Sequence, residues 1–221
     1  MKKLIILFLL IFISACNISN KEDVLKDIKK VVSKSKEGYE LISNNYLELF
    51  DYYLPSDVSE KECGTDYCVF NYDNSKIYMN INISGIIAEK YYKDNMIVDD
   101  DFLSVEKIIY HDSGLIKKDD TNIPFYLNVY EYDNIYFVHY YNNEVNIYAS
   151  SLLNELPSLI KRIFILDSGI NIDKDYIIAN YSNKAVIDYE KKPVDLFEYI
   201  VPSEGILEEL IVEKEADNWW K

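Results

Sequence analysis

The sequence predicts an α+β fold: an N-terminal amphipathic helix, then an antiparallel sheet built of hairpins, with helical segments near the C-terminus. Three observations predict it. Apolar positions recur at helical spacing in residues 22–53, apolar and polar residues alternate in residues 76–84, and two strand-like segments flank Asp133-Asn134. Strands joined by short turns favour an antiparallel sheet over a parallel α/β one.

The N-terminal helix is expected over residues 22–53. Its apolar or neutral positions follow steps of three, four or seven: Val24, Ile28, Val31, Ser35, Ile42, Tyr46, Leu49 and Tyr53. Asn20 is the expected N-cap, Pro55 ends the element, and Gly38 is a candidate break into two pieces. A helix packed on the domain's own core is favoured over a coiled-coil partner helix.

Three hairpins and a second helix are expected after Pro55. The expected strands are 67–72 with 76–84, 125–132 with 135–141, 144–150, and 176–180 with 185–189. The second helix is expected over 152–166, with Pro157 in its first turn or breaking it, and residues 196–200 and 206–214 are short helices or edge pieces. Residues 99–101 and 117–122 are expected loops.

The N-terminus has the organisation of an export signal. Lys2 and Lys3 precede an apolar run over residues 4–13, which is shorter than the roughly 20 residues that cross a bilayer. Ile13-Ser14-Ala15-Cys16 resembles the lipobox of bacterial lipoproteins, in which an aliphatic and two small residues precede the lipidated cysteine. The alternative is an ordinary signal peptide that ends at a cysteine.

The resemblance implies that residues 1–15 are removed and that Cys16 becomes a lipidated first residue. Residues 16–22 are then a tether, and residues 23–221 form a single α+β domain, since no Pro/Gly/Ser linker interrupts residues 55–190. Acyl chains contribute about 0.8 kcal/mol per buried CH₂, so two or three of them anchor the protein stably. Asn17 is not the aspartate that retains many lipoproteins in an inner membrane, so in a cell with two membranes the family's sorting rule favours the outer one.

The chain is strongly acidic. Removal of Lys2 and Lys3 takes the formal net charge from −15 to −17. Such a charge repels nucleic-acid phosphates and anionic lipid headgroups, so we expect no nucleic-acid binding and a domain that stands off the membrane. The expected partners are the membrane, through the lipid anchor, and a protein or another component of the envelope.

Cys63 and Cys68 are the only cysteines besides Cys16. Export to an oxidising compartment and a spacer of four residues favour a disulfide across a tight hairpin. The alternative is a metal site that adds His111 and His139. Those histidines are 28 residues apart, whereas structural zinc sites show compact ligand pairs, so no metal site is expected.

The sequence contains no recognisable catalytic motif or cofactor-binding motif. Gly-x-Ser-x-Gly and Ser-x-x-Lys are absent, and the six glycines are scattered. His139 is expected on a sheet face, and His111 beside the turn residues Asp112-Ser113-Gly114. Neither is expected to act as a general base. We therefore expect no catalytic residues, no cofactor and no enzymatic activity.

Two features are candidates for an interaction surface. Asp99-Asp100-Asp101 form the densest acidic cluster, and Trp219-Trp220 are the only tryptophans. The favoured function is a non-enzymatic binding lipoprotein, for example an immunity protein that neutralises a basic toxin. The alternatives are an extracytoplasmic hydrolase acting on glycan or peptide, and a module that binds sugars or small molecules through some of the 21 tyrosines.

Overall fold

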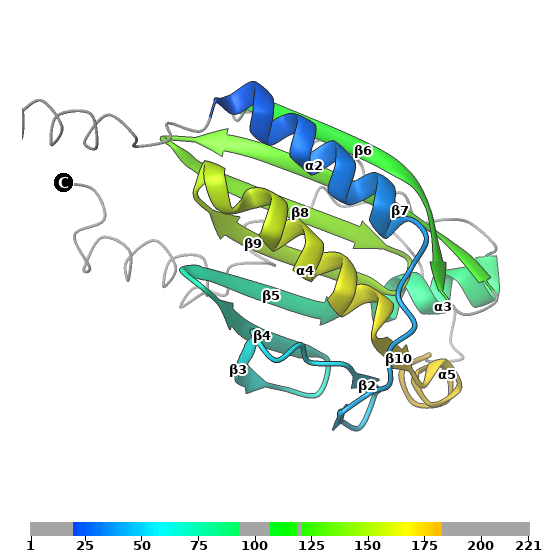
Figure 1. Cartoon of the computed structure of the whole chain (residues 1–221). Helices are drawn as coiled ribbons and strands as arrows, with labels where there is room; N and C mark the ends of the chain where they lie inside the picture. The colour runs from blue at the N-terminus through cyan, green and yellow to red at the C-terminus, as the bar shows by residue number, and fades with distance from the viewer. Residues whose placement is uncertain (1–19, 93–106, 119–120, 183–221) are drawn as a thin grey trace, which may run out of the picture.

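The computed structural model describes residues 20–92, 107–118 and 121–182, and its architecture is the expected α+β one. A seven-stranded antiparallel sheet in the order β3-β4-β5-β9-β8-β7-β6 carries two helices, α2 and α4, on one face (Figure 1). Its strands are β3 Ser59–Cys63, β4 Tyr67–Tyr72, β5 Ser75–Ile81, β6 Lys107–Lys118, β7 Thr121–Tyr132, β8 Ile135–Asn142 and β9 Val145–Ser151.

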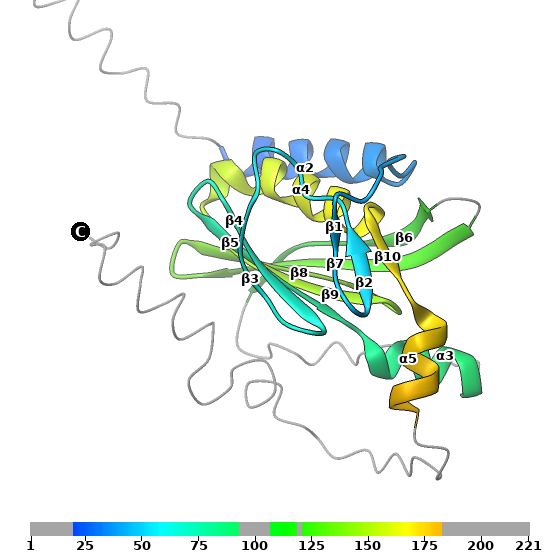
Figure 2. The ribbon, with the colours of Figure 1, turned by 90° about the horizontal axis from the view of Figure 1, so that it is seen from below.

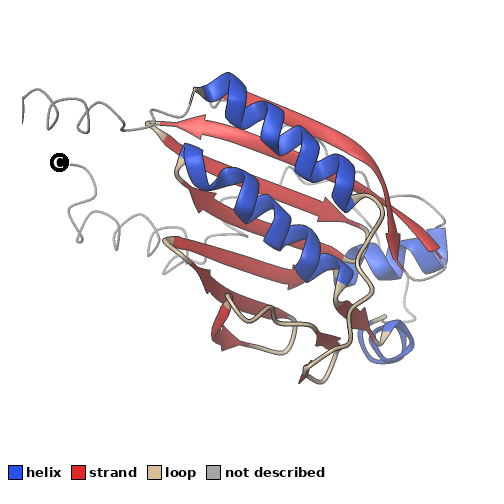
Figure 3. Ribbon diagram, in the orientation of Figure 1, coloured by secondary structure: helices blue, strands red, loops and turns tan. Residues whose placement is uncertain are grey.

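Smaller elements complete the described part of the chain. A second sheet has three strands, β1 Asn45–Tyr46, β2 Phe50–Tyr52 and β10 Ile170–Ile172. The helices are α2 Lys21–Ser35, α3 Ile83–Tyr92, α4 Leu156–Ser168 and α5 Lys174–Tyr181, with a 3-10 turn, η2, at Leu153–Glu155. Figure 2 shows α2 and α4 together on one side of the large sheet, and Figure 3 shows α3 and α5 at one end of it.

Helix α2 confirms the expected start but not the expected length. Asn20 caps it by accepting a hydrogen bond from the Glu22 backbone N–H at 3.3 Å, and its buried face includes Val24, Ile28 and Val32. The prediction that helix continues to residue 53 is wrong, because α2 ends at Ser35. Gly38 follows with φ +74°, a conformation that favours glycine, and a Cβ there would lie 1.9 Å from the Lys117 carbonyl oxygen.

Four hairpin strands and the second helix lie where they were expected. Strands β4, β7, β8 and β9 match the predicted segments, and Asp133 and Asn134 both adopt positive φ in the β7–β8 turn. Pro157 is in the first turn of α4, where its missing N–H costs no helical hydrogen bond.

Three predicted segments differ from the structure at their ends. The strand expected over 76–84 stops at Ile81, because the Asn82 side chain accepts from the Gly85 N–H at 2.9 Å and so starts α3. Residues 176–180, expected as a strand, are helical in α5, because Asp173 caps the Tyr176 N–H at 2.9 Å. Residues 117 and 118 end β6 and residues 121 and 122 begin β7, so most of the predicted 117–122 loop is strand.

Strand β6 contains the predicted turn Asp112-Ser113-Gly114. These residues pair in continuous register with Leu127, Tyr126 and Phe125 of β7, so that they are extended rather than turned. Turn-type residues are tolerated here because β6 is at the edge of the sheet: among the strands that the structure describes, it pairs on one side only, with β7.

The core lies between the sheet and the two helices. Phe164 of α4 meets Phe125 and Tyr140 edge-on, with ring centroids 5.2 and 5.1 Å away.

Among the helices of the described ranges, none combines the length and the apolar character that a membrane span requires. The predicted strand at 185–189, the segments at 196–200 and 206–214, and the signal and tether before residue 20 lie outside the described residues.

Candidate functional site

Six aromatic rings form a continuous row across the face of the large sheet that α2 and α4 do not cover. Successive residues of a strand point to opposite faces, and Tyr140 points to α4, so His139 and Tyr141 point away from it. From β4 to β7 the row, called here the ring row, is Tyr67, Tyr78, Tyr148, His139, Tyr141 and Tyr126.

Strand register brings the ring row together. His139 is directly opposite Tyr148, and Tyr148 is directly opposite Tyr78, so three neighbouring strands each place one ring on the same line. Successive ring centroids along the row are 5.8, 6.4, 4.5, 4.7 and 4.9 Å apart. All of these separations lie within the usual range for interacting aromatic pairs.

The two histidines lie on this same face. Asn128 of β7 is opposite both His111 of β6 and His139 of β8, and its Oδ1 is 2.6 Å from His111 Nδ1. The placement of His139 on a sheet face is confirmed. The placement of His111 beside a turn is wrong, because His111 is an exposed residue in the middle of β6.

Burial keeps three members of the ring row, His139, Tyr78 and Tyr148, uncharged near neutral pH. His139 is 4% exposed, and burial lowers its pKa to about 3. Burial, with smaller contributions from Asp66 and Tyr67, raises the pKa of Tyr78 to about 12, and burial also raises the pKa of Tyr148. Neutral rings with phenol hydroxyls suit stacking and hydrogen bonding better than proton transfer.

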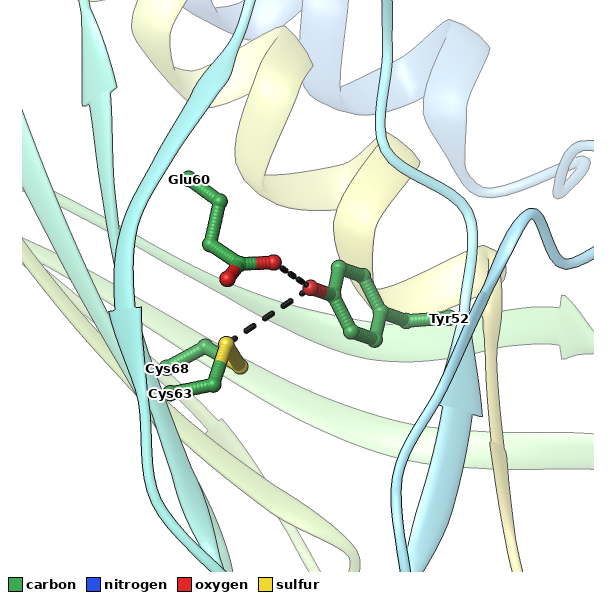
Figure 4. Close-up of a disulfide and its surroundings, with 4 residues drawn as sticks. All are labelled: Tyr52, Glu60, Cys63 and Cys68. Atoms are coloured by element: carbon green, nitrogen blue, oxygen red, sulfur yellow. Dashed lines mark hydrogen bonds between the residues drawn. A yellow bond between two sulfur atoms is a disulfide. The ribbon is translucent and has the colours of Figure 1, made fainter.

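The disulfide is the second distinctive feature. Cys63 and Cys68 are directly opposite each other in the β3–β4 hairpin and are bonded, as the sequence predicted. Tyr52 of the small sheet points at this corner (Figure 4): its hydroxyl donates to the Glu60 carboxylate and lies 3.5 Å from Cys63 Sγ. The corner therefore joins the two sheets and leaves neither of these sulfurs as a free thiol.

A buried acidic cluster near the C-terminal end of α4 was not expected from the sequence. Asp167, fully buried, accepts hydrogen bonds from the Tyr140 hydroxyl at 2.7 Å and from the Asn142 amide at 2.9 Å. Glu144 is bound by Lys118 at 2.9 Å and by Lys174 at 2.6 Å. Burial raises the pKa of Asp167. It also acts to raise the pKa of Glu144, but the two lysines together outweigh burial and lower it.

This cluster can tie elements together, because its residues come from β6, α4, α5 and the β8–β9 region. No sequence motif marks it, since the pairing is long-range. The ring row had a usable signal: Tyr78, Tyr148, His139 and Tyr141 alternate with apolar residues in their strands, so each belongs to the face opposite the apolar one.

The structure does not describe the other site residues that the sequence predicts. Cys16, Asp99, Asp100, Asp101, Trp219 and Trp220 lie outside the described residues. Within the ranges that the structure describes, no three His, Cys, Asp or Glu residues are grouped so that they could hold a metal ion.

Comparison with known proteins finds no family model and no curated protein that matches this chain.

Proposed function

We propose that the chain is a lipid-anchored, extracytoplasmic binding protein without enzymatic activity. The lipobox-like Ile13-Ser14-Ala15-Cys16 carries the proposal. The fold is compatible with it: α2 begins at Lys21, five residues after Cys16, so a folded domain directly follows the lipid attachment site.

The states of the reactive side chains support binding rather than catalysis. Cys63 and Cys68 are joined in a disulfide, so neither is a thiol nucleophile. His139 has a pKa of about 3, far below the value near 7 that suits a general base at neutral pH. The ring row instead offers stacked rings, of which the half-buried Tyr67, Tyr78 and Tyr126 can contact a bound molecule.

Metabolic labelling with an alkyne fatty acid tests the anchor. Wild-type protein is expected to incorporate the label and to sediment with membranes, and Cys16→Ala to lose both properties. A Cys63→Ala/Cys68→Ala variant is the matched control, because it removes two cysteines but leaves the lipobox intact. Labelling of the Cys16→Ala variant would overturn the proposal.

The partner we propose is a protein or envelope component that carries positive charge, such as a basic toxin, because the mature chain is strongly acidic. Binding should then weaken with added salt, since exposed charges are screened within about 8 Å at physiological ionic strength. The trial compares partner capture by wild type, by a triple Asp→Lys variant at Asp99, Asp100 and Asp101, and by a His111→Ala/His139→Ala variant.

Capture is expected to fall in the triple aspartate variant and to survive in the histidine variant if that variant folds. Circular dichroism and the unfolding midpoint establish that it does. A folded histidine variant that loses its cellular phenotype while capture is untouched would favour the hydrolase alternative.

The ring row favours one second candidate, a module that binds sugars or other small ring-shaped molecules. Tyr78 and Tyr67 are half-buried, and each stacks against its neighbour in the row. Titration with soluble envelope oligosaccharides, followed by NMR, should show binding that Tyr78→Ala abolishes. Tyr46→Ala is the control, because Tyr46 is an exposed tyrosine of the small sheet. Equal binding by both variants would reject this candidate.

A further inference from the structure

The start of α2 lies at the end of the domain where β7 turns into β8. Lys21 Nζ is 2.5 Å from Glu131 Oε2 near the end of β7, and the Tyr136 hydroxyl donates to Glu131 Oε1 at 2.9 Å from the start of β8. The first turn of α2 is therefore fixed beside the β7–β8 turn, at the left of Figure 1.

Three exposed apolar side chains lie at this same end. Tyr132, which follows Glu131, is 57% exposed, and Ile108, whose neighbour Lys107 is paired with Glu131, is 49% exposed. Leu152, 37% exposed, follows Ser151, which is paired with Tyr136. Each of the three therefore lies next to the contact between Glu131 and Tyr136. Tyr132 adjoins Glu131 itself, and the other two adjoin residues that pair with Glu131 or with Tyr136.

The chain between Cys16 and α2 is short. Five residue steps reach at most about 18 Å when fully extended. An acylated Cys16 would therefore hold the start of α2 close to the headgroups. It would not let this end of the domain stand away from the membrane, as the acidic composition alone suggested.

We propose that this end of the domain faces the lipid surface, and that Tyr132, Ile108 and Leu152 make its contact with the membrane. The inference rests on the proposed lipidation of Cys16. Tyrosine is enriched at membrane interfaces, and apolar side chains there enter the boundary between headgroups and acyl chains by about 5–10 Å.

Charge selects the kind of lipid. Four carboxylates lie at this end, on Glu22, Asp23, Glu131 and Asp133, against three lysines: Lys21 is bound to Glu131, Lys26 to Asp23, and Lys107 is opposite Glu131. Carboxylates at this end disfavour anionic headgroups, so the contact suits a zwitterionic surface better than an anionic one.

Leu115 is the natural control. It is 55% exposed, it lies on β6 like Ile108, and it pairs with Pro124, which is eight residues before Tyr132 in β7. That distance along the strand is about 27 Å. Leu115 is therefore well away from the anchor, and its exposure is close to that of Tyr132, which is 57% exposed.

The experiment uses full-length lipidated protein in which Trp219 and Trp220 are replaced by phenylalanine and one tryptophan is introduced, by Tyr132→Trp or by Leu115→Trp. Each is inserted into phosphatidylcholine vesicles with brominated acyl chains, and tryptophan quenching is measured. Quenching is expected to be several-fold stronger for Tyr132→Trp, and to weaken when phosphatidylglycerol replaces part of the phosphatidylcholine.

Two failures are distinguishable. Protein that carries no lipid and does not bind vesicles would overturn the proposed anchor and this inference together. Lipidated, vesicle-bound protein in which the two variants are quenched equally, or Leu115→Trp more strongly, would overturn the orientation alone and leave the anchor in place.

Discussion

The two faces of the seven-stranded sheet differ in what they bury. On the face covered by α2 and α4, neighbouring strands supply aliphatic and aromatic carbon, with Val138, Ile147 and Phe125 all essentially inaccessible. On the opposite face, the same strands supply the ring row and Asn128. Both faces contain buried polar groups, but on the first they lie at one end, around Asp167 and Asn142, whereas on the second His139 and Asn128 lie beside the stacked rings.

Adjacent residues of β8 show how local the difference is. Tyr140 points to Phe164 and donates its hydroxyl to Asp167, whereas His139 stacks between Tyr148 and Tyr141 on the other side. Alternation therefore identifies which residues share a face, but a strand with both faces buried no longer shows which face is the core. Substitutions on each face can show whether the two faces also differ in their contribution to stability.

The largest effect is expected on the helix-covered face. Phe164→Ala removes a fully buried ring from between Phe125 and Tyr140, so unfolding in denaturant should show a loss of about 3–5 kcal/mol. Tyr67→Ala, at the half-buried end of the ring row, is the comparison and should cost clearly less. Equal losses would mean that both faces contribute to the core alike.

The next effect is expected at the polar end of the sheet. Glu144→Gln leaves the poorly exposed Lys118 without its carboxylate partner, and breaking such a buried pair costs about 3 kcal/mol. The pKa of Glu144 is lowered in the fold, so its contribution is complete above its unfolded pKa. That contribution is lost as pH falls through the folded value, and the variant should then approach wild type.

An exposed ion pair is the control for this variant. Asp23→Asn removes the partner of Lys26 within α2, where both side chains are largely exposed, and should cost less than about 0.5 kcal/mol. A cost for Glu144→Gln that is just as small, measured at pH 7, would contradict a structural role for the cluster.

Local signals predicted most of the fold correctly. Asn20 and Pro157 mark helix starts, and Asp133-Asn134 mark a turn, because each of these residues acts on the backbone next to it. The failures needed long-range information. Whether residues 36–53 continue α2 depends on the approach of Gly38 to Lys117, and whether Asp112-Ser113-Gly114 turn depends on pairing with β7.

The disulfide should have a moderate effect. Its loop spans a sequence separation of only 5, so replacing Cys63 and Cys68 by serine should lower the free energy of unfolding by about 2 kcal/mol. Native protein from an oxidising compartment should show no titratable thiol from this pair before reduction. Two reactive thiols in that protein would contradict the bond.

The site residues divide in the same way as the fold. The Cys63–Cys68 pair was predictable, because two cysteines five positions apart have few alternatives in a chain that the sequence predicts to be exported. The ring row was not predicted as a unit, because its six members come from five strands whose order, β4-β5-β9-β8-β7, differs from their order in the chain. The Asp167–Glu144 cluster forms only when β6, α4 and α5 pack together. The sequence of any one of these segments does not predict that packing.

The smallest change in the free energy of unfolding, taken per pH unit, is expected at His139. Burial lowers its pKa to about 3 in the fold, whereas an unfolded histidine titrates near 6.5. Between those values the unfolded chain binds a proton that the folded protein does not, so stability is complete above about pH 6.5 and falls by about 1.4 kcal/mol per pH unit below it. His139→Phe keeps a ring between Tyr141 and Tyr148 but removes the titration, so its unfolding free energy should fall less steeply between pH 6.5 and 4.5.

His111→Phe, at an exposed position, is the control and should keep the steep dependence, because that dependence comes from the buried ring. Denaturant unfolding at pH 7, 5.5 and 4.5 measures both variants. If the slope were unchanged in His139→Phe, the second face would not exclude the proton, and the contrast between the two faces would be one of composition alone.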